Sequence, residues 1–324
     1  MGRLTYRALA CLALFTPASA MACACGCGVF DTGITGVTPQ ASDHGLSMFI
    51  SLGAMNQDRN REQGHAASAD DNTDKRIASQ FYTVGLTYTV NPKWMIMAQV
   101  PLLHRRFTTT GSDTNDNPVI ETVPTTALGD AVINVMYTGF GDFGATGLGV
   151  GVKLPTGSTT SPLDGYGQPA YDRDTLPGTG STDLQIVGYH VGHIRGAARW
   201  FVHGQVRVAV ATKGDYRPGN EFDGAIGVTY DLPAGKTVIA PTLQLIGSVR
   251  GRDSGGEASA NSGYSRLLFA PGLRVQVTRR LSIYGDVEFP VAQYVKTASS
   301  IEDEGTIGQL VAPALFKLQL SYGF

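Results

Sequence analysis

The chain has 324 residues, a formal net charge of −2, 41 glycines and only 16% charged residues. This near-neutral balance excludes nucleic acid as a partner, because phosphate backbones are bound by a clear surplus of Lys and Arg. Beyond the N-terminus, no apolar run approaches the roughly 20 residues that a membrane-spanning helix requires, so a helical membrane protein is also excluded. Many glycines and few charges are typical of strands separated by turns.

Residues 1–22 have the pattern of a signal peptide. Arg3 and Arg7 supply the charged start, and residues 8–15 supply the apolar core. Two overlapping small-x-small patterns predict cleavage after Ala20 or Ala22. We therefore expect the mature chain to be exported, which for this sequence means a Gram-negative envelope.

Residues 23–44 form an expected Cys-rich periplasmic segment. Cys23, Cys25 and Cys27 lie two residues apart, so an extended chain would project all three thiols to one side. Thiolates select soft metal ions, but this spacing is not the paired C-x₂-C pattern of a structural zinc site. A disulfide or disordered tail, a site for a soft metal ion or a redox partner, and a lipid on Cys23 all stay open. The sequence predicts no other cofactor.

Strand-like segments fill residues 45–324, which we expect to be one barrel domain. They are predicted at residues 46–56, 77–90, 94–107, 129–140, 146–154, 182–193, 198–211, 222–230, 237–249, 264–277, 281–295 and 309–324. Short turns alternate with longer loops, which together with an even strand count is typical of outer-membrane barrels. The predicted fold class is all-β, a transmembrane antiparallel up-and-down β-barrel of about 12 strands with both termini in the periplasm.

The last predicted strand, residues 309–324, carries the clearest pattern. Alternate residues from Leu310 to Phe324 form an apolar row, while the other row becomes small or polar. Such a strand suits a wall with lipid outside and water inside. Leu320, Tyr322 and Phe324 resemble the terminal signal by which outer-membrane barrels are recognised for assembly. Expected partners are therefore outer-membrane lipids, the barrel-assembly machinery and a small-molecule solute.

Charged residues in the alternating strands are expected to face the lumen. An Arg or Lys on the lipid face would cost about 2–4 kcal/mol at mid-membrane, so alternation assigns them inward. The lumen-lining candidates are Asp130, Lys153, Asp183, His203, Arg207, Arg250, Arg266, Arg274, Asp286, Glu288 and Lys317. Two interpretations stay open: a set of ion pairs that fills and stiffens a narrow barrel, or a polar permeation path.

An enzyme is not predicted, and no catalytic residue is assigned. A lipase-type barrel would need a Ser, a His and an Asn or Asp that meet on the lipid face. The six histidines lie mostly in predicted loops or near strand ends, and no such set can be assembled from them.

Three short glycine-rich elements resemble one family of outer-membrane proteins. They are Leu128-Gly129-Asp130, residues 153–158 (KLPTGS) and residues 177–183 (PGTGSTD). These elements resemble the phenol-degradation meta-pathway transporter family. The resemblance implies an outer-membrane barrel that passes small, often aromatic or hydrophobic, molecules. The N-terminal CxCxC is not part of that family's pattern.

The leading functional hypothesis is a passive outer-membrane channel for small solutes, with loops around Asn115 and Gly165 gating the outer mouth. The alternative is a closed barrel that acts as a binding or scaffold module, whose CxCxC docks a metal or a periplasmic redox partner. A metal uptake or efflux pore is a third hypothesis, in which the three cysteines would alter transport.

Overall fold

The computed structural model describes residues 45–115, 117–141, 144–298 and 308–324. The predicted signal peptide and the Cys-rich segment, with Cys23, Cys25 and Cys27, lie outside these residues. Across the described ranges, no helix combines the length and the apolar character that a membrane crossing requires.

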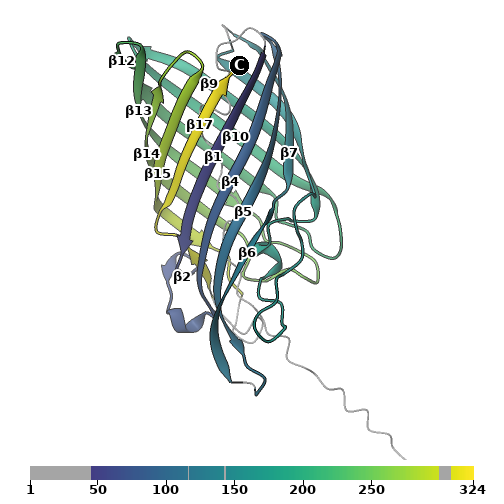
Figure 1. Cartoon of the computed structure of the whole chain (residues 1–324). Coiled ribbons are helices and arrows are strands. Elements are labelled where there is room, and N and C mark those ends of the chain that lie inside the picture. Colours follow the sequence, from purple (N-terminus) through teal and green to yellow (C-terminus); the bar gives the residue numbers. More distant parts are fainter. Residues whose placement is uncertain (1–44, 116, 142–143, 299–307) are drawn as a thin grey trace, which may run out of the picture.

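The described chain is almost entirely β-structure (Figure 1). The strands are β1 (Gly45–Gln57), β2 (Arg59–Glu62), β3 (His65–Ala66), β4 (Asp74–Asn91), β5 (Trp94–Ser112), β6 (Pro118–Leu128), β7 (Ala131–Phe140), β8 (Thr146–Leu154), β9 (Ser181–Arg195), β10 (Ala198–Thr212), β11 (Glu221–Tyr230), β12 (Leu232–Ala234), β13 (Thr237–Arg250), β14 (Tyr264–Gln276), β15 (Leu281–Val295), β16 (Gln309–Val311) and β17 (Leu315–Gly323). Two 3₁₀ turns, η1 (Ala69–Asp71) and η2 (Arg173–Thr175), lie in the connections.

One antiparallel sheet closes on itself as a barrel. Its order is β11-β10-β9-β8-β7-β5-β4-β1-β17-β15-β14-β13, and pairing of β11 with β13 closes the ring. β6 continues into β7 and β11 into β12, so the wall has twelve crossings, which confirms the predicted fold class. Closure removes the free strand edges that could not find hydrogen-bond partners in lipid.

The two ends of the barrel differ in their connections. The end that carries Phe324 has only short turns, at residues 92–93, 141–145, 196–197, 235–236 and 277–280, and is called the turn end. The opposite end, called the loop end, carries the long connections and a separate small sheet of β16, β2 and β3. Figure 1 shows the C-terminus at the turn end and the hairpin of β5 and β6 projecting beyond the loop end.

The period of two in the sequence determines which side chains face outward. On β17, Phe316, Leu318 and Leu320 are exposed, whereas Lys317 and Gln319 between them are buried in the interior. The same alternation on the other strands gives a continuous apolar outer band. Burying polar side chains inside and presenting apolar ones to lipid is the arrangement expected of a membrane barrel.

The predicted strand at 309–324 is wrong in its first half. Residues 309–311 form β16, which pairs with β2 in the small sheet, and β17 begins only at Leu315. Leu310 and Ala312 are therefore buried at the loop end rather than facing lipid. Pro313 explains the break, because proline has no backbone N–H to donate to a ladder.

The predicted loop at 108–126 is also wrong, since most of it is strand. β5 runs on to Ser112 and returns as β6, which pairs with β5 alone. Its composition of Thr and Pro is typical of a loop, yet Pro118 and Pro124 are tolerated because β6 is an edge strand. The expected loop after β1 likewise contains β2, β3 and η1.

A row of glycines lines the inner face of β8. Each is covered by a side chain of a neighbouring strand: Gly147 by Tyr189, Gly149 by Met136 and Gly151 by Asn134. A Cβ on Gly149 would lie 2.6 Å from the Met136 Cγ and 2.8 Å from the carbonyl oxygen of Val135. The missing side chains thus let Met136 and Tyr189 pack with Met95 and Val187 inside the barrel near the turn end.

We predict that Gly149→Val destabilises the barrel by about 1–3 kcal/mol, because the added atoms overpack this interior. Gly247→Val on β13 is the matched control, since a Cβ there has no atom within 4 Å. Denaturant unfolding of the purified barrel, followed by tryptophan fluorescence, measures both. Equal midpoints for the two variants would contradict the packing role of the glycine row.

Candidate functional site: a charged cavity beneath a cap of loops

The barrel interior holds a cavity of about 240 Å³ with two unlike walls. One wall comes from the neighbouring strands β4, β5 and β7 and carries the apolar side chains Phe81, Met97 and Val132 beside the polar Thr83, Gln99 and Asn134. The other is charged and comes from β10, β11 and β13: Arg207, Glu221, Asp223 and Arg250. In the closed ring, β4 and β5 lie diametrically opposite β11 and β13, so the two walls face each other.

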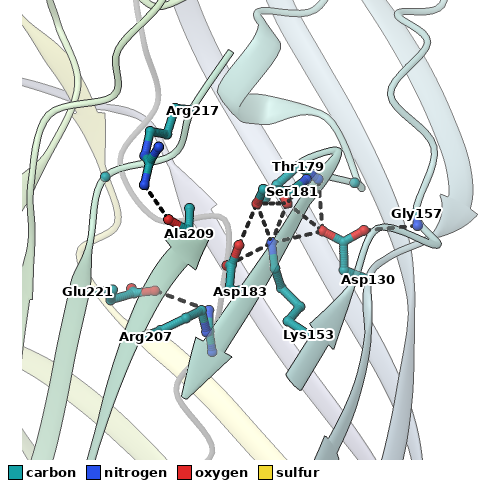
Figure 2. A network of polar contacts seen from close by, with 12 residues as sticks. Asp130, Lys153, Gly157, Thr179, Ser181, Asp183, Arg207, Ala209, Arg217 and Glu221 are labelled. Atoms are coloured by element: carbon teal, nitrogen blue, oxygen red, sulfur yellow. Dashed lines mark hydrogen bonds and ion pairs between the residues drawn. The ribbon is translucent and has the colours of Figure 1, made fainter. Parts of the chain in front are cut away.

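Lys153 is the centre of a buried ion cluster at one side of the cavity (Figure 2). Its Nζ lies 3.2 Å from Oδ2 of Asp130 and 2.9 Å from Oδ2 of Asp183, and it donates to Oγ of Ser181 at 3.0 Å. All three charged side chains are at most 6% exposed. A buried ammonium ion is tolerated only with such partners, because desolvation of an isolated charge is very costly.

Asp130 also anchors the long connection of residues 155–180 at both of its ends. Its Oδ1 accepts the backbone N–H of Gly157 at 2.9 Å. Its Oδ2 accepts the backbone N–H and the hydroxyl of Thr179 at 2.9 and 2.6 Å (Figure 2). One carboxylate, placed where β6 passes into β7, thus fixes where this connection leaves and rejoins the wall.

The glycines around Asp130 allow the backbones to approach closely. A Cβ on Gly178 would lie 2.3 Å from the carbonyl carbon of Gly157, and one on Gly129 would lie 2.8 Å from the ring of Pro101. The three glycine-rich elements noted in the sequence therefore meet at one place in the fold. Their glycines permit the close packing, while Asp130 and Lys153 provide the charges.

A second polar cluster lies on the charged wall. Glu221 forms an ion pair with Arg207 at 3.2 Å and accepts the Tyr264 hydroxyl at 2.8 Å. Asp223 accepts from Gln205 at 2.9 Å and from the Ser248 hydroxyl. Sequence reasoning missed Glu221 and Asp223. Both alternate with exposed apolar residues along β11, and this alternation indicates that their side chains face inward.

Arg173 joins three loops over the loop end of the cavity. Its guanidinium stacks on the Tyr216 ring at 4.4 Å from the centroid and pairs with Glu257 at 3.2 Å. It also donates to the carbonyl oxygens of Gly178 and Thr179 at 3.1 and 2.6 Å. We call the connections 155–180, 213–220 and 251–263 together the cap, since these contacts hold them to one another.

An apolar core beside the cavity joins the cap to neighbouring strands. It is formed by Ile77, Phe107, Ala170, Tyr171, Leu176 and Leu310, with Val123 packed against them. The Tyr171 hydroxyl donates to the carbonyl oxygen of Val123 at 2.6 Å, and burial raises the pKa of this phenol to about 12. β6 and β16, the two segments that sequence reasoning assigned wrongly, both contribute to this core.

The sequence-predicted lumen residues occupy three places. Seven line the cavity: Asp130, Lys153, Asp183, His203, Arg207, Arg250 and Lys317. Arg266, Asp286 and Glu288 lie on β14 and β15 and are not among the cavity-lining residues. Arg274 lies near the turn end, where it pairs with Asp231 at 2.8 Å.

The candidate metal ligands Cys23, Cys25 and Cys27 lie outside the described residues. Within the ranges that the structure describes, no group of three or more His, Cys, Asp or Glu side chains is arranged to hold a metal ion.

Comparison with known proteins identifies the fold. No family model matches the chain, and no curated protein matches it. The structure is similar to an outer-membrane channel from Pseudomonas putida F1, with a TM-score of 0.62 and 13% identity over 89% of this chain and 98% of that one. It is also similar to the β domain of a Bordetella autotransporter, with a TM-score of 0.51 and 12% identity over 87% of this chain and 100% of that one. The chain thus has the fold of an outer-membrane barrel.

We predict that Lys153→Met destabilises the protein by about 3–5 kcal/mol, because it leaves Asp130 and Asp183 buried without their cation. Denaturant unfolding measures the loss, and Lys213→Met, at an exposed lysine of the loop end, is the matched control with little expected change.

Adding Asp183→Asn to Lys153→Met should recover part of the stability, since it removes one unpaired charge. Strictly additive losses would contradict the cluster.

Proposed function

We propose that the protein is a passive outer-membrane channel for small solutes that combine an apolar body with a polar or charged group. The observation that carries this proposal is the cavity in which a wall with a group of apolar side chains faces a charged wall. An apolar body can lie against Phe81 and Met97 while a polar group meets Arg207 and Glu221. The likeness in fold to an outer-membrane channel supports the same conclusion.

The proposed orientation places the turn end in the periplasm and the loop end outside the cell. Short periplasmic turns and longer outside loops are the usual asymmetry of such barrels. Exposed aromatic residues near the turn end, including Trp94, Tyr230 and Tyr322, suit the interfacial girdle at that membrane boundary. On this basis both ends of the barrel chain lie on the periplasmic side.

Passage through the barrel requires two barriers to move. The cap lies over the loop end of the cavity, and the contacts of Arg173 hold its segments together. Nearer the turn end, buried Met95, Met136 and Tyr189 occupy the interior. The described conformation is therefore the closed state of the proposed channel, and the cap is the barrier that an incoming solute meets first.

We predict that the reconstituted protein admits labelled phenylalanine, which has an aromatic body and both charges, faster than serine into liposomes. Val132→Trp should lower this uptake by about fivefold or more, because its indole would fill the cavity. Val135→Trp is the matched control, since Val135 is on the same strand but faces lipid, where Trp is tolerated. Uptake equal to that of empty liposomes would overturn the channel proposal.

We predict that Arg173→Ala raises uptake of the same solute about fivefold, as expected if the lost stacking and ion pair stabilise the closed cap by about 1 kcal/mol. Glu257→Gln keeps the stacking on Tyr216 and should have a smaller effect, because the Glu257 side chain is 55% exposed. An unchanged uptake in Arg173→Ala would show that the cap is not the limiting barrier.

A closed barrel that binds a solute without passing it is the second candidate. The contacts that close the cap and the buried side chains near the turn end favour it. This candidate predicts saturable binding of phenylalanine to the detergent-purified protein, no uptake into liposomes, and no gain of uptake in Arg173→Ala. A scaffold role for the CxCxC segment would belong to this candidate.

A further inference from the structure

The turn end carries a ring of exposed basic side chains. They lie on the turns or strand ends that join β4 to β5, β9 to β10, β12 to β13 and β14 to β15: Lys93, Arg195, Lys236, Arg279 and Arg280. We call these five residues the basic ring. None of their side chains forms an ion pair with another part of the described chain.

Within the part of the turn end that the structure describes, acidic side chains do not neutralise the basic ring. Among the turn-end residues that the structure describes, Asp231 is the only acid. Its carboxylate is already shared by Arg199 at 2.7 Å and Arg274 at 2.8 Å, so it has no charge to spare for the ring. Among the described residues of the turn end, basic side chains therefore outnumber acidic ones.

The loop end is different, because its exposed charges are of both signs. Among the residues that the structure describes there, the exposed acids are Asp58, Glu62, Asp70, Asp71, Asp215 and Glu257. Its exposed bases are Arg59, Arg76, Arg106, Lys213, Arg217 and Arg252. A general need for solubility would place mixed charges at both ends, so the one-sided ring calls for a specific partner.

The basic ring lies at the boundary of the apolar outer band. Lys93 is followed directly by the exposed Trp94, and Arg195 is preceded by the exposed Ile194. Arg280 directly precedes Leu281, the first residue of β15, which pairs with the exposed Tyr322 of β17. Charges at this level lie where the head groups of the bilayer begin, and their alkyl stems can lie along apolar surface.

We propose that the basic ring binds the head groups of anionic phospholipids in the leaflet that surrounds the turn end. Each basic side chain near an anionic lipid surface is attracted to it, and arginine and lysine both bind phosphate. The ring is spread over four turns around the circumference. Separate lipid molecules can reach all four turns at once, whereas a compact acidic protein would have to cover the whole mouth of the barrel.

The protein contains its own probes for this interaction. Its two tryptophans, Trp94 and Trp200, both lie on the lipid-facing side at the turn end. Trp200 packs over Gly192 and lies 5.0 Å from the His190 ring, while Trp94 adjoins Lys93 of the ring. Brominated lipid quenches tryptophan only on contact, so fluorescence reports which lipids lie beside the ring.

The experiment reconstitutes the full barrel in vesicles that contain either brominated phosphatidylglycerol or brominated phosphatidylcholine in a phosphatidylcholine background. We expect the anionic lipid to associate about two- to fivefold more strongly than the neutral one at low salt, and the preference to fall as salt screens it. Equal quenching by the two lipids would overturn the proposal, leaving an acidic protein as the remaining partner class.

Two matched triple variants test whether the ring causes the preference. K93Q/R279Q/R280Q should lower the ratio of anionic to neutral quenching towards one, with the remaining preference supplied by Arg195 and Lys236. R59Q/R106Q/K213Q removes three exposed charges from the loop end and should leave the ratio unchanged. Each variant is normalised to its own quenching by the neutral lipid, which corrects for changes around Trp94. An equal fall in both variants would attribute the effect to net charge and overturn the proposal.

Discussion

The buried charge of Lys153 is the interaction on which the loop end of the barrel depends. An ammonium ion with 6% exposure persists only if its partners compensate for lost hydration, and Asp130 and Asp183 provide that compensation. Asp130 in turn needs donors for its remaining lone pairs and takes them from the backbone and hydroxyl groups of the cap. The wall, the cavity and the 155–180 connection of the cap are therefore coupled through one ion cluster.

The wall of the barrel is predictable because its rule is local. Lipid outside and water inside require a period of two, so a short window of residues already determines which face each side chain takes. The predicted secondary structure is wrong at Pro313 and along β6. At these positions, contacts with distant segments determine the structure, whereas the local composition of β6 is typical of a loop. There, Leu310 and Val123 find apolar partners in the core of the cap, which alternation along a single strand cannot reveal.

The site is only half predictable, because part of it follows from local alternation and part depends on contacts between loops that are distant in the sequence. Alternation places Lys153 and Arg207 inside the barrel, and the glycine-rich elements around Asp130 indicate a shared structural role. The contact of Arg173 with Glu257 joins two loops 84 positions apart, and no periodicity links them. Glu221 and Asp223 are an intermediate case, because they alternate with exposed apolar residues along β11, and this pattern alone places them inside the barrel.

The unequal attachment of the cap gives it a hinge side and a free side. On the side of β7, β8 and β9, buried bonds to Asp130 hold the 155–180 connection at both ends. On the opposite side, the 155–180 connection is joined to the rest of the cap by the stacking of Arg173 on Tyr216 and by its bond to the half-exposed Glu257. Separation costs least on the free side, which lies over the charged wall. A solute admitted there meets Arg250 and Glu221 with its polar group first, and its apolar body follows towards Phe81.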